Sequence, residues 1–253
     1  MNKLQGKEIR IVQGTSDDEI ENRNQFRELY KNNPIPEREM LSNLGLFLSR
    51  QTLSRIIFMH ELYTKIVPVH GVVMEFGVRW GQNLALFSAF RGMYEPFNYS
   101  RKVIGFDTFS GFPVVDQKDG SDVKVGDYSV SENYEDYLEK VLSSHELESP
   151  IPHKKKFELV KGDATITVDD YLSKHPETII ALVYFDFDIY LPTKKCLESI
   201  KPYLTRGSVI AFDELNFQEF PGETIALREV FGLDKYHIRR SPLNPLCSYI
   251  VID

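Results

Sequence analysis

Two apolar segments of the sequence end abruptly in carboxylates. One, Val-Tyr-Phe-Asp-Phe-Asp, ends in Asp186 and Asp188, and a later one, Ser-Val-Ile-Ala-Phe, runs into Asp213 and Glu214. Buried carboxylates are costly unless they are paired or bind a cation, and open α/β sheets bind their ligands at strand ends. Four acids that converge there repel one another strongly. We therefore predict that they hold a hard divalent cation with oxygen ligands, Mg²⁺.

A glycine-containing segment lies earlier in the chain, where another predicted strand meets its helix. It reads Glu75-Phe-Gly77-Val-Arg-Trp-Gly81. Both glycines can adopt positive φ and allow a ligand close to the backbone. The spacing differs from G-x-G-x-x-G, which disfavours a dinucleotide site. An acid followed by two glycines suits a nucleoside with a positively charged amino-acid tail, and the structural alternative is a tight strand-to-helix turn.

Two further acids end predicted strands. Asp107 follows Lys-Val-Ile-Gly-Phe, and Asp163 follows Phe-Glu-Leu-Val-Lys-Gly. In nucleotide-binding α/β folds an acid in the first of these places accepts hydrogen bonds from ribose hydroxyls. Asp163 would receive the exocyclic amine of an adenine. For each residue the alternative is a helix cap or a loop acid.

These residues require a parallel sheet to bring them together. Strand-like patterns alternate with helical ones and indicate an α/β fold with helices on both faces of the sheet. We expect a final antiparallel pair at residues 237–239 and 248–252, which is compatible with a mixed sheet. The expected strands are 72–76, 102–107, 157–161, 179–186 and 208–212, and the expected helices are 83–93, 134–147, 168–174, 193–204 and 223–231.

The chain divides into two parts by composition. Residues 1–67 are expected to form an N-terminal arm and a helical extension, because the first 33 or so are polar and residues 38–66 carry apolar side chains at helical spacing. The polar part suits a mobile arm, a partner-binding segment or part of a lid. Residues 68–253 form the α/β domain. Its polar excursion at about 111–133 is too long for an ordinary connection, and we expect it to be a lid.

Charge and composition exclude several classes of protein. The 253 residues carry a net charge of −7, which argues against nonspecific nucleic-acid binding. No apolar run approaches the length of a membrane span, and the polar N-terminus does not resemble a signal peptide. Cys196 and Cys247 lie in apolar segments and are expected to be reduced core thiols. A cytoplasmic protein is predicted.

Taken in order, these motifs resemble the TylF-type macrocin O-methyltransferase family. The resemblance covers about residues 68–231, and its specific parts are Asp107-Thr-Phe-Ser-Gly-Phe-Pro and Asp186-Phe-Asp188-Ile-Tyr190-x-x-Thr193. Members are S-adenosylmethionine-dependent enzymes that methylate sugar hydroxyls on natural products. The resemblance implies a Rossmann-like class I methyltransferase fold with a seven-stranded sheet.

The resemblance also implies a role for each site residue. Asp186, Asp213 and Glu214 would hold Mg²⁺ and Asp188 would be the general base. Where this chain has Glu214, family members commonly have a second Asp. The cofactor S-adenosylmethionine would contact five residues: Glu75, Gly77 and Gly81 at its methionine end, Asp107 at its ribose and Asp163 at its adenine.

The predicted reaction is methyl transfer to a hydroxyl of a sugar, a sugar nucleotide or another sugar-derived acceptor, and the N-terminal helices suit a homo-oligomer contact. Phenolic diols remain possible acceptors. Two other classes stay open at this point. One is a metal-dependent phosphoryl-transfer or hydrolytic enzyme that uses the same carboxylates. The other is a non-catalytic cofactor-binding module that acts through partners.

Overall fold

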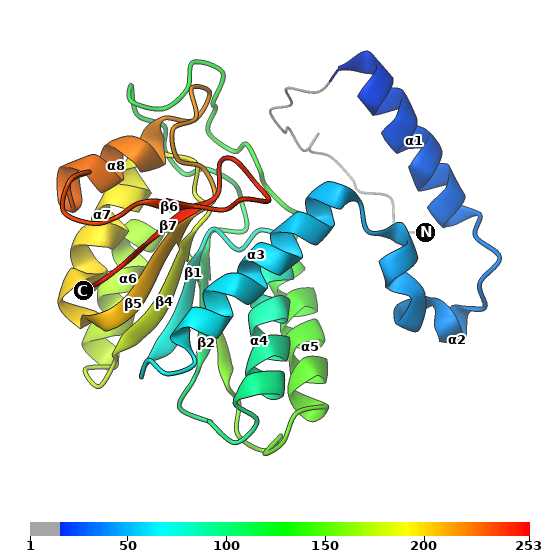
Figure 1. The fold of residues 1–253 in the computed structure, drawn as a ribbon, viewed down its shortest axis with the longest axis horizontal. Coiled ribbons are helices and arrows are strands. Elements are labelled where there is room, and N and C mark those ends of the chain that lie inside the picture. Colours follow the sequence, from blue (N-terminus) through cyan, green and yellow to red (C-terminus); the bar gives the residue numbers. More distant parts are fainter. Residues whose placement is uncertain (1–15) are drawn as a thin grey trace.

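The fold is built on a seven-stranded sheet in the order β3-β2-β1-β4-β5-β7-β6 (Figure 1). The computed structural model of the protein describes residues 16–253. The first five strands are parallel, and β7 is antiparallel to both β5 and β6, which confirms the predicted mixed sheet. The strands are β1 Val72–Phe76, β2 Val103–Asp107, β3 Phe157–Lys161, β4 Ile180–Phe185, β5 Leu204–Phe212, β6 Arg239–Arg240 and β7 Ser248–Val251.

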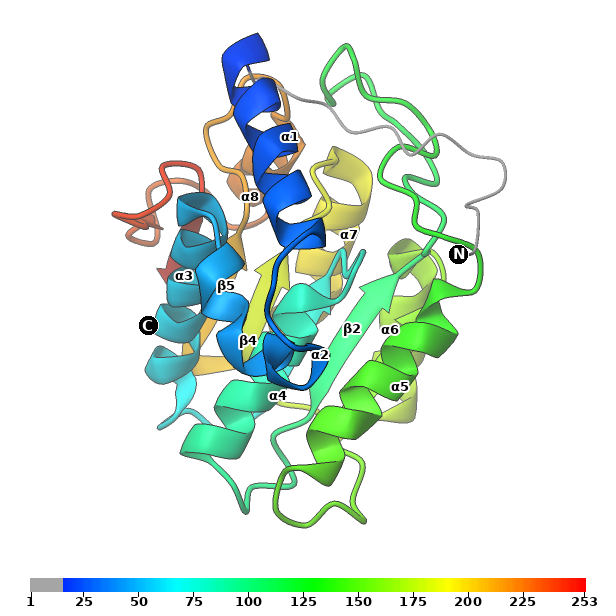
Figure 2. The same ribbon diagram turned by 90° about the vertical axis from the view of Figure 1, so that its right-hand side faces the viewer.

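Helices cover both faces of this sheet, as predicted (Figures 1 and 2). One layer packs on the first apolar core, and the other packs on the second. The first layer contains α3 Arg50–Ile66, α4 Gln82–Tyr94 and α5 Tyr134–Leu147, and the second contains α6 Ala164–Lys174, α7 Tyr190–Ile200 and α8 Gly222–Val230, with the short 3₁₀ helix η2 Lys201–Tyr203 after α7.

A row of stacked phenylalanines fixes the register at the ligand-binding edge of the sheet. Phe76 stacks on Phe106 and on Phe185, with ring centroids 4.7 and 5.1 Å away, and Phe185 stacks on Phe212 at 5.4 Å. All four rings are buried in the core, where aromatic stacking adds to the free energy of burial. Each of β2, β4 and β5 has its acid directly after this row. The acids therefore emerge side by side at one edge.

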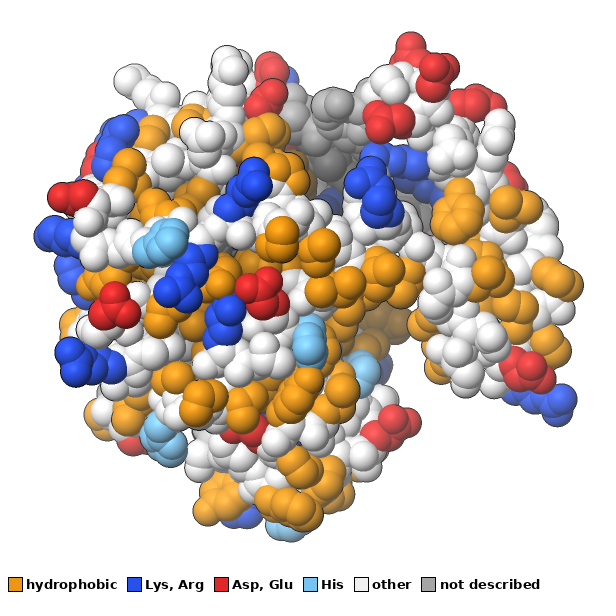
Figure 3. Space-filling view, in the orientation of Figure 1, with side chains coloured by type: hydrophobic (Ala, Val, Ile, Leu, Met, Phe, Trp, Pro, Cys, Tyr) orange, Lys and Arg blue, Asp and Glu red, His pale blue; other side chains and the backbone are white. Residues whose placement is uncertain are grey.

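The N-terminal helices lie to one side of the α/β core (Figures 1 and 3). They are α1 Asp17–Lys31, α2 Glu37–Met40 and the 3₁₀ helix η1 Leu41–Phe47, and none of them contributes a buried residue. Ser16 begins α1 with a capping box that includes Glu19. This helix was not predicted from the sequence. The first 15 residues of the predicted arm lie outside the described part.

The helix α3 belongs to the α/β core by its packing. Five of its residues, Phe58, Met59, Leu62, Tyr63 and Ile66, are buried. The domain boundary after residue 67 stays a prediction.

The excursion at residues 111–133 contains no helix or strand. It is held at its base by backbone hydrogen bonds between Phe112 and the pair Gly126 and Asp127. Phe112 and Val123 pack in a small cluster with Ile189 and Phe220. The segment is thus docked on the ends of β4 and α8, and its role as a lid stays a prediction.

Two smaller expectations concern membranes and thiols. Among residues 16–253, no helix combines the length and the apolar character that crossing a bilayer requires. Cys196 and Cys247 are buried free thiols, as predicted.

Candidate active site

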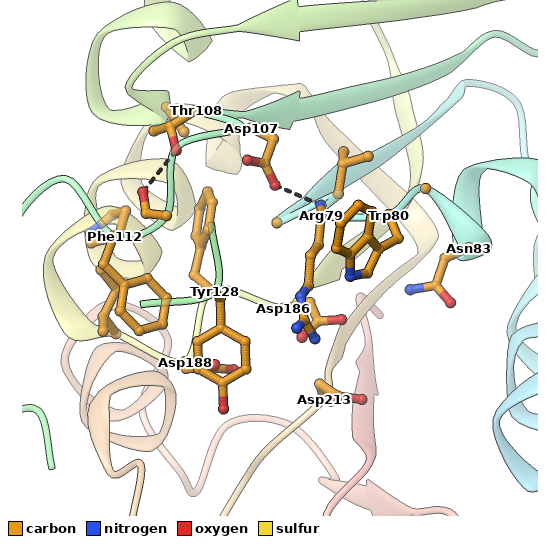
Figure 4. Close-up of a pocket in the computed structure, with 18 of the residues that line it drawn as sticks. Arg79, Trp80, Asn83, Asp107, Thr108, Phe112, Tyr128, Asp186, Asp188 and Asp213 are labelled. Atoms are coloured by element: carbon orange, nitrogen blue, oxygen red, sulfur yellow. Dashed lines mark hydrogen bonds between the residues drawn. The ribbon is translucent and has the colours of Figure 1, made fainter. Parts of the chain in front are cut away.

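A cavity of about 290 Å³ opens at the carboxyl ends of the central strands. In Figure 4, Asp107 lies on one side of it, Asp186, Asp188 and Asp213 lie on the opposite side, and the side chain of Arg79 lies between Trp80 and Tyr128. The cavity brings together almost all of the predicted site residues: Gly77, Gly81, Asp107, Asp163, Asp186, Asp188, Asp213 and Glu214 line it, and Glu75 does not.

The two glycines of the β1–α4 loop have positive φ, as the sequence suggested. A Cβ at Gly77 (φ 94°) would lie 2.0 Å from the backbone oxygen of Asp186, and one at Gly81 (φ 77°) would lie 2.4 Å from Cδ1 of Leu138. Both contacts are too short for any side chain. The predicted tight turn is therefore present, and it also places the backbone at the cavity wall.

Glu75 lies beneath this loop and is 1% exposed. The amide nitrogen of Asn83 donates to one carboxylate oxygen at 2.9 Å. The other oxygen, Oε2, is buried without a hydrogen-bond partner in the described structure. Burial raises the pKa of Glu75 well above its usual range. An unpaired buried acceptor fits a ligand ammonium group, although a direct contact needs local rearrangement because Glu75 does not line the cavity.

Asp107 is held rigidly at the end of β2. Its carboxylate accepts hydrogen bonds from the backbone N–H groups of Arg79 at 2.7 Å and Phe109 at 2.6 Å (Figure 4). Burial raises its pKa and these two donors oppose the shift. The carboxylate keeps lone pairs for ligand hydroxyls, because each oxygen can accept more than one hydrogen bond.

Asp163 caps α6. Its Oδ1 accepts from the backbone N–H of Thr165 at 2.9 Å and from the hydroxyl of the same residue at 2.7 Å. The capping interpretation is therefore correct. Asp163 also lines the cavity, so contact with a ligand amine stays a prediction.

Arg55, on α3, is the main site residue that the sequence analysis missed. Its guanidinium forms ion pairs with Asp186 and, at 3.3 Å, with Asp213. The hydroxyl of Tyr184 donates to Asp213 at 2.6 Å. Arg55 lies 131 residues from Asp186 along the chain, and no local pattern links the two.

The carboxylates around Arg55 are unusually basic. Burial, then the nearby Asp213, raises the pKa of Asp186 to about 7 despite the opposing guanidinium. Burial and Asp213 raise the pKa of Glu214 to about 8. For Asp188, which is 7% exposed, burial and then Glu214 raise the pKa well above its usual range. The guanidinium of Arg55 neutralises only part of the negative charge of these acids. Bound protons therefore neutralise a further part near neutral pH.

An arginine bridges two of the three predicted magnesium ligands in this structure. Arg55 lies between Asp186 and Asp213, and residues 16–253 contain no group of three or more His, Cys, Asp or Glu side chains placed to hold a metal ion. A metal would have to displace the guanidinium.

Aromatic side chains line the cavity on two sides. Trp80 packs edge-on against Tyr134 with ring centroids 4.8 Å apart. Phe112 and Tyr128 come from the 111–133 segment, and the guanidinium of Arg79 lies 4.9 Å from the Tyr128 ring centroid. The 111–133 segment thus contributes two aromatic side chains to the cavity wall.

Other side chains near the 111–133 segment serve packing. Asp116 and Asp119 are absent from the cavity lining. Asp119 instead accepts from the backbone N–H of Tyr190 at 2.7 Å. The Tyr190 hydroxyl donates to Glu229 at 2.6 Å and does not line the cavity.

Comparison with known proteins identifies the fold and its chemistry. A crystal structure of CalS11, a calicheamicin methyltransferase, is 44% identical to this chain, with a TM-score of 0.91, and the match covers 98% of this chain and 97% of that one. An apo structure of CalS11, described as a TDP-rhamnose 3'-O-methyltransferase, is 41% identical over 97% and 99% of the two chains, with a TM-score of 0.84. The O-methyltransferase NovP, at 18% identity, 79% coverage of each chain and a TM-score of 0.57, shares the fold.

No family model and no curated protein matches the chain. The two CalS11 matches extend over nearly the whole length, and they favour methyl transfer over the phosphoryl-transfer and non-catalytic alternatives. The chain belongs to the same family as CalS11 and is a class I S-adenosylmethionine-dependent O-methyltransferase.

Proposed function

We propose that this enzyme methylates a hydroxyl of a sugar nucleotide or a related sugar-derived acceptor, as the TylF-type resemblance also implies. The observation that carries the proposal is the 41% identity, over 97% of the chain, to a protein described as a TDP-rhamnose 3'-O-methyltransferase. The cavity supports it. Carboxylates and a guanidinium on one side can bind adjacent hydroxyls, and aromatic side chains on the other can cover the sugar or base.

In this proposal Asp188 is the general base. Its side chain lines the cavity at the end of β4. In its ionised form Asp188 would accept the proton of the acceptor hydroxyl whose oxygen is to be methylated. Bound S-adenosylmethionine supplies a methyl group on a positively charged sulfur, which is a good leaving group. The chain's remaining task is to align the acceptor oxygen with the methyl carbon.

We propose that the cofactor binds on the other side of the cavity. We propose that Gly77, Gly81 and Glu75 contact its methionine part, Asp107 its ribose hydroxyls and Asp163 its adenine. Support comes from the unpaired Oε2 of Glu75 and from the Asp107 carboxylate, fixed by two backbone donors at the cavity edge.

Magnesium assistance through Asp186, Asp213 and Glu214 stays a prediction, and no step above depends on it. If Mg²⁺ binds here, the ion has to replace the guanidinium of Arg55 between Asp186 and Asp213. A homo-oligomer also stays a prediction. Its contact would bury apolar side chains of the N-terminal helices, such as Leu29, Leu41 and Leu46, which are 66%, 81% and 67% exposed.

The test is a transfer assay with S-adenosylmethionine labelled in the methyl group. Acceptors would include a thymidine diphosphate hexose, the free hexose, a hexose glycoside and a catechol, and mass spectrometry would detect the methylated product. The proposal predicts label on the sugar of the nucleotide sugar or the glycoside. Label on the catechol alone would overturn it, as would methylation of the base instead of the sugar.

A further inference from the structure

Glu223 is a buried acid next to the site, and no role is assigned to it above. It lies in the first turn of α8 and is 0% exposed. Among the described residues it has no ion pair. Burial, and then the charges of Asp188, Asp186 and Glu214, raise its pKa well above the usual range. Burying an acid beside other acids is costly, so its hydrogen bonds need an explanation.

Both oxygens of Glu223 accept hydrogen bonds from the two turns that carry the site acids. The backbone N–H of Phe187, which lies between Asp186 and Asp188, donates to Oε1 at 3.2 Å. The backbone N–H of Glu214, which follows Asp213, donates to Oε2 at 3.4 Å. One carboxyl group therefore joins the ends of β4 and β5. It adds to the ion pairs of Arg55 with Asp186 and Asp213 and to the backbone N–H of Asp213, which donates to the carbonyl of Phe185 at 2.9 Å.

The position of Glu223 is itself fixed by close packing of α8. A Cβ at the preceding residue, Gly222, would lie 2.5 Å from the backbone nitrogen of Tyr190 and 2.8 Å from the backbone carbon of Ile189. The start of α8 thus lies directly against the turn that follows Asp188. That turn also needs support, because Asp188 has a φ of 62°, a left-handed conformation that is unfavourable for a residue other than glycine.

We propose that Glu223 is a positioning residue that holds the Asp186–Asp188 turn and the Asp213–Glu214 turn in register, and so sets the distance between the general base and the other acids. The catalytic meaning of that distance rests on the proposed function. The two hydrogen bonds of Glu223 do not depend on that function. A misplacement of about 1 Å in a catalytic group can cost about 10²-fold in rate. Loss of the hydrogen bonds to Glu223 should therefore slow turnover.

Two substitutions remove the hydrogen bonds that Glu223 accepts to different extents. Glu223→Gln keeps the size and one acceptor oxygen but turns an amide NH₂ toward one of the two N–H groups, and Glu223→Ala removes both acceptors. Glu198→Gln is the matched control, because Glu198 is exposed on α7. Hydrogen exchange followed by mass spectrometry would report on peptides that contain Phe187 and Glu214. The same variants would be assayed for kcat, for the acceptor KM and for S-adenosylhomocysteine binding.

We expect faster exchange in both peptides, slower turnover by about tenfold for Gln and about 10²-fold for Ala, and cofactor affinity within about twofold of the original, since the cofactor contacts lie on β1, β2 and β3. Unchanged exchange at both turns in a folded Gln variant would overturn the proposal. Faster exchange with unchanged kcat would overturn it as well. If the unsubstituted enzyme methylates no sugar acceptor, the proposed function fails, while the exchange data still decide whether Glu223 joins the two turns.

Discussion

The two sides of the cavity satisfy their acids in different ways. On the proposed cofactor side, Asp107 and Asp163 accept backbone hydrogen bonds from nearby residues, which hold each carboxylate in place before any ligand binds. On the proposed acceptor side, Asp186 and Asp213 share the guanidinium of Arg55. The first arrangement is preorganised for binding. The second groups acids whose pKa values burial and mutual repulsion raise, which is a feature common at functional sites.

The largest expected effect comes from removing the proton acceptor. Asp188→Asn keeps the size and the hydrogen-bonding ability of the side chain but cannot take a proton from the acceptor. We expect kcat to fall by about 10²–10⁴-fold, the usual contribution of general acid–base catalysis. Steady-state methyl transfer measures it, with Asp170→Asn, an exposed residue on α6, as the control. Retained turnover would place the base elsewhere on this side.

Removing the shared cation should destabilise the acceptor side. Arg55→Met leaves Asp186 and Asp213 without their partner. Breaking a buried ion pair costs about 3–5 kcal/mol, and since these side chains are 29%, 25% and 15% exposed, we expect about 1–3 kcal/mol in the free energy of unfolding. Denaturant titration measures it, with Arg38→Met, whose side chain is 83% exposed, as the control.

Magnesium sharpens the same experiment. If Arg55 occupies the predicted metal position, Mg²⁺ should raise the melting temperature of Arg55→Met more than that of the original protein. An equal response of the two proteins to Mg²⁺ would mean that Arg55 does not occupy the predicted metal position.

The smallest effect is a pH dependence of stability. The pKa values of Asp186 and Glu214 rise to about 7 and about 8 in the folded protein. Below the unfolded-state pKa, near 4, both states are protonated and no penalty exists. As pH rises toward 8, the folded protein must release protons that the unfolded chain has already lost, so the free energy of unfolding falls.

Substituting Glu214 tests this direction. Glu214→Gln removes one of the acids whose pKa is raised in the folded protein. The melting temperature should therefore rise by about 2–4 °C at pH 8.5, corresponding to about 1 kcal/mol, and by less at pH 5. Scanning calorimetry at both pH values measures it. A larger gain at pH 5 than at pH 8.5 would mean that the raised pKa of Glu214 is wrong.

Sequence patterns predicted the strands and the acids at their ends because both are local. Residues 134–147 and 157–161 are the helix α5 and the strand β3 as expected. The acids converge because parallel strands expose the same ends, and the stacked phenylalanines before them keep the strands in register. Strand β5 begins earlier than expected, at Leu204, and so does α6, at Ala164 directly after its cap Asp163.

What could not be predicted depends on distant contacts. Arg55 lies on a helix 158 residues before Asp213. The apolar residues around it predicted the helix, but not which side chains Arg55 contacts. Glu223 looked like an ordinary first-turn acid of α8. For α1, the capping pair Ser16 and Glu19 was a readable signal, but the segment is mostly polar and was therefore interpreted as an arm.

The most direct test of the division between the two sides is calorimetric titration of S-adenosylhomocysteine into two variants under one set of conditions. Asp107→Ala removes a carboxylate from the cofactor side and Asp188→Asn alters one on the acceptor side. We predict that Asp107→Ala weakens binding by about 2–4 kcal/mol, from hydrogen bonds to a charged group worth about 1.5–3 kcal/mol each, and that Asp188→Asn binds like the original enzyme. Unchanged affinity in folded Asp107→Ala, together with weakened binding in Asp188→Asn, would contradict the assignment of the two sides.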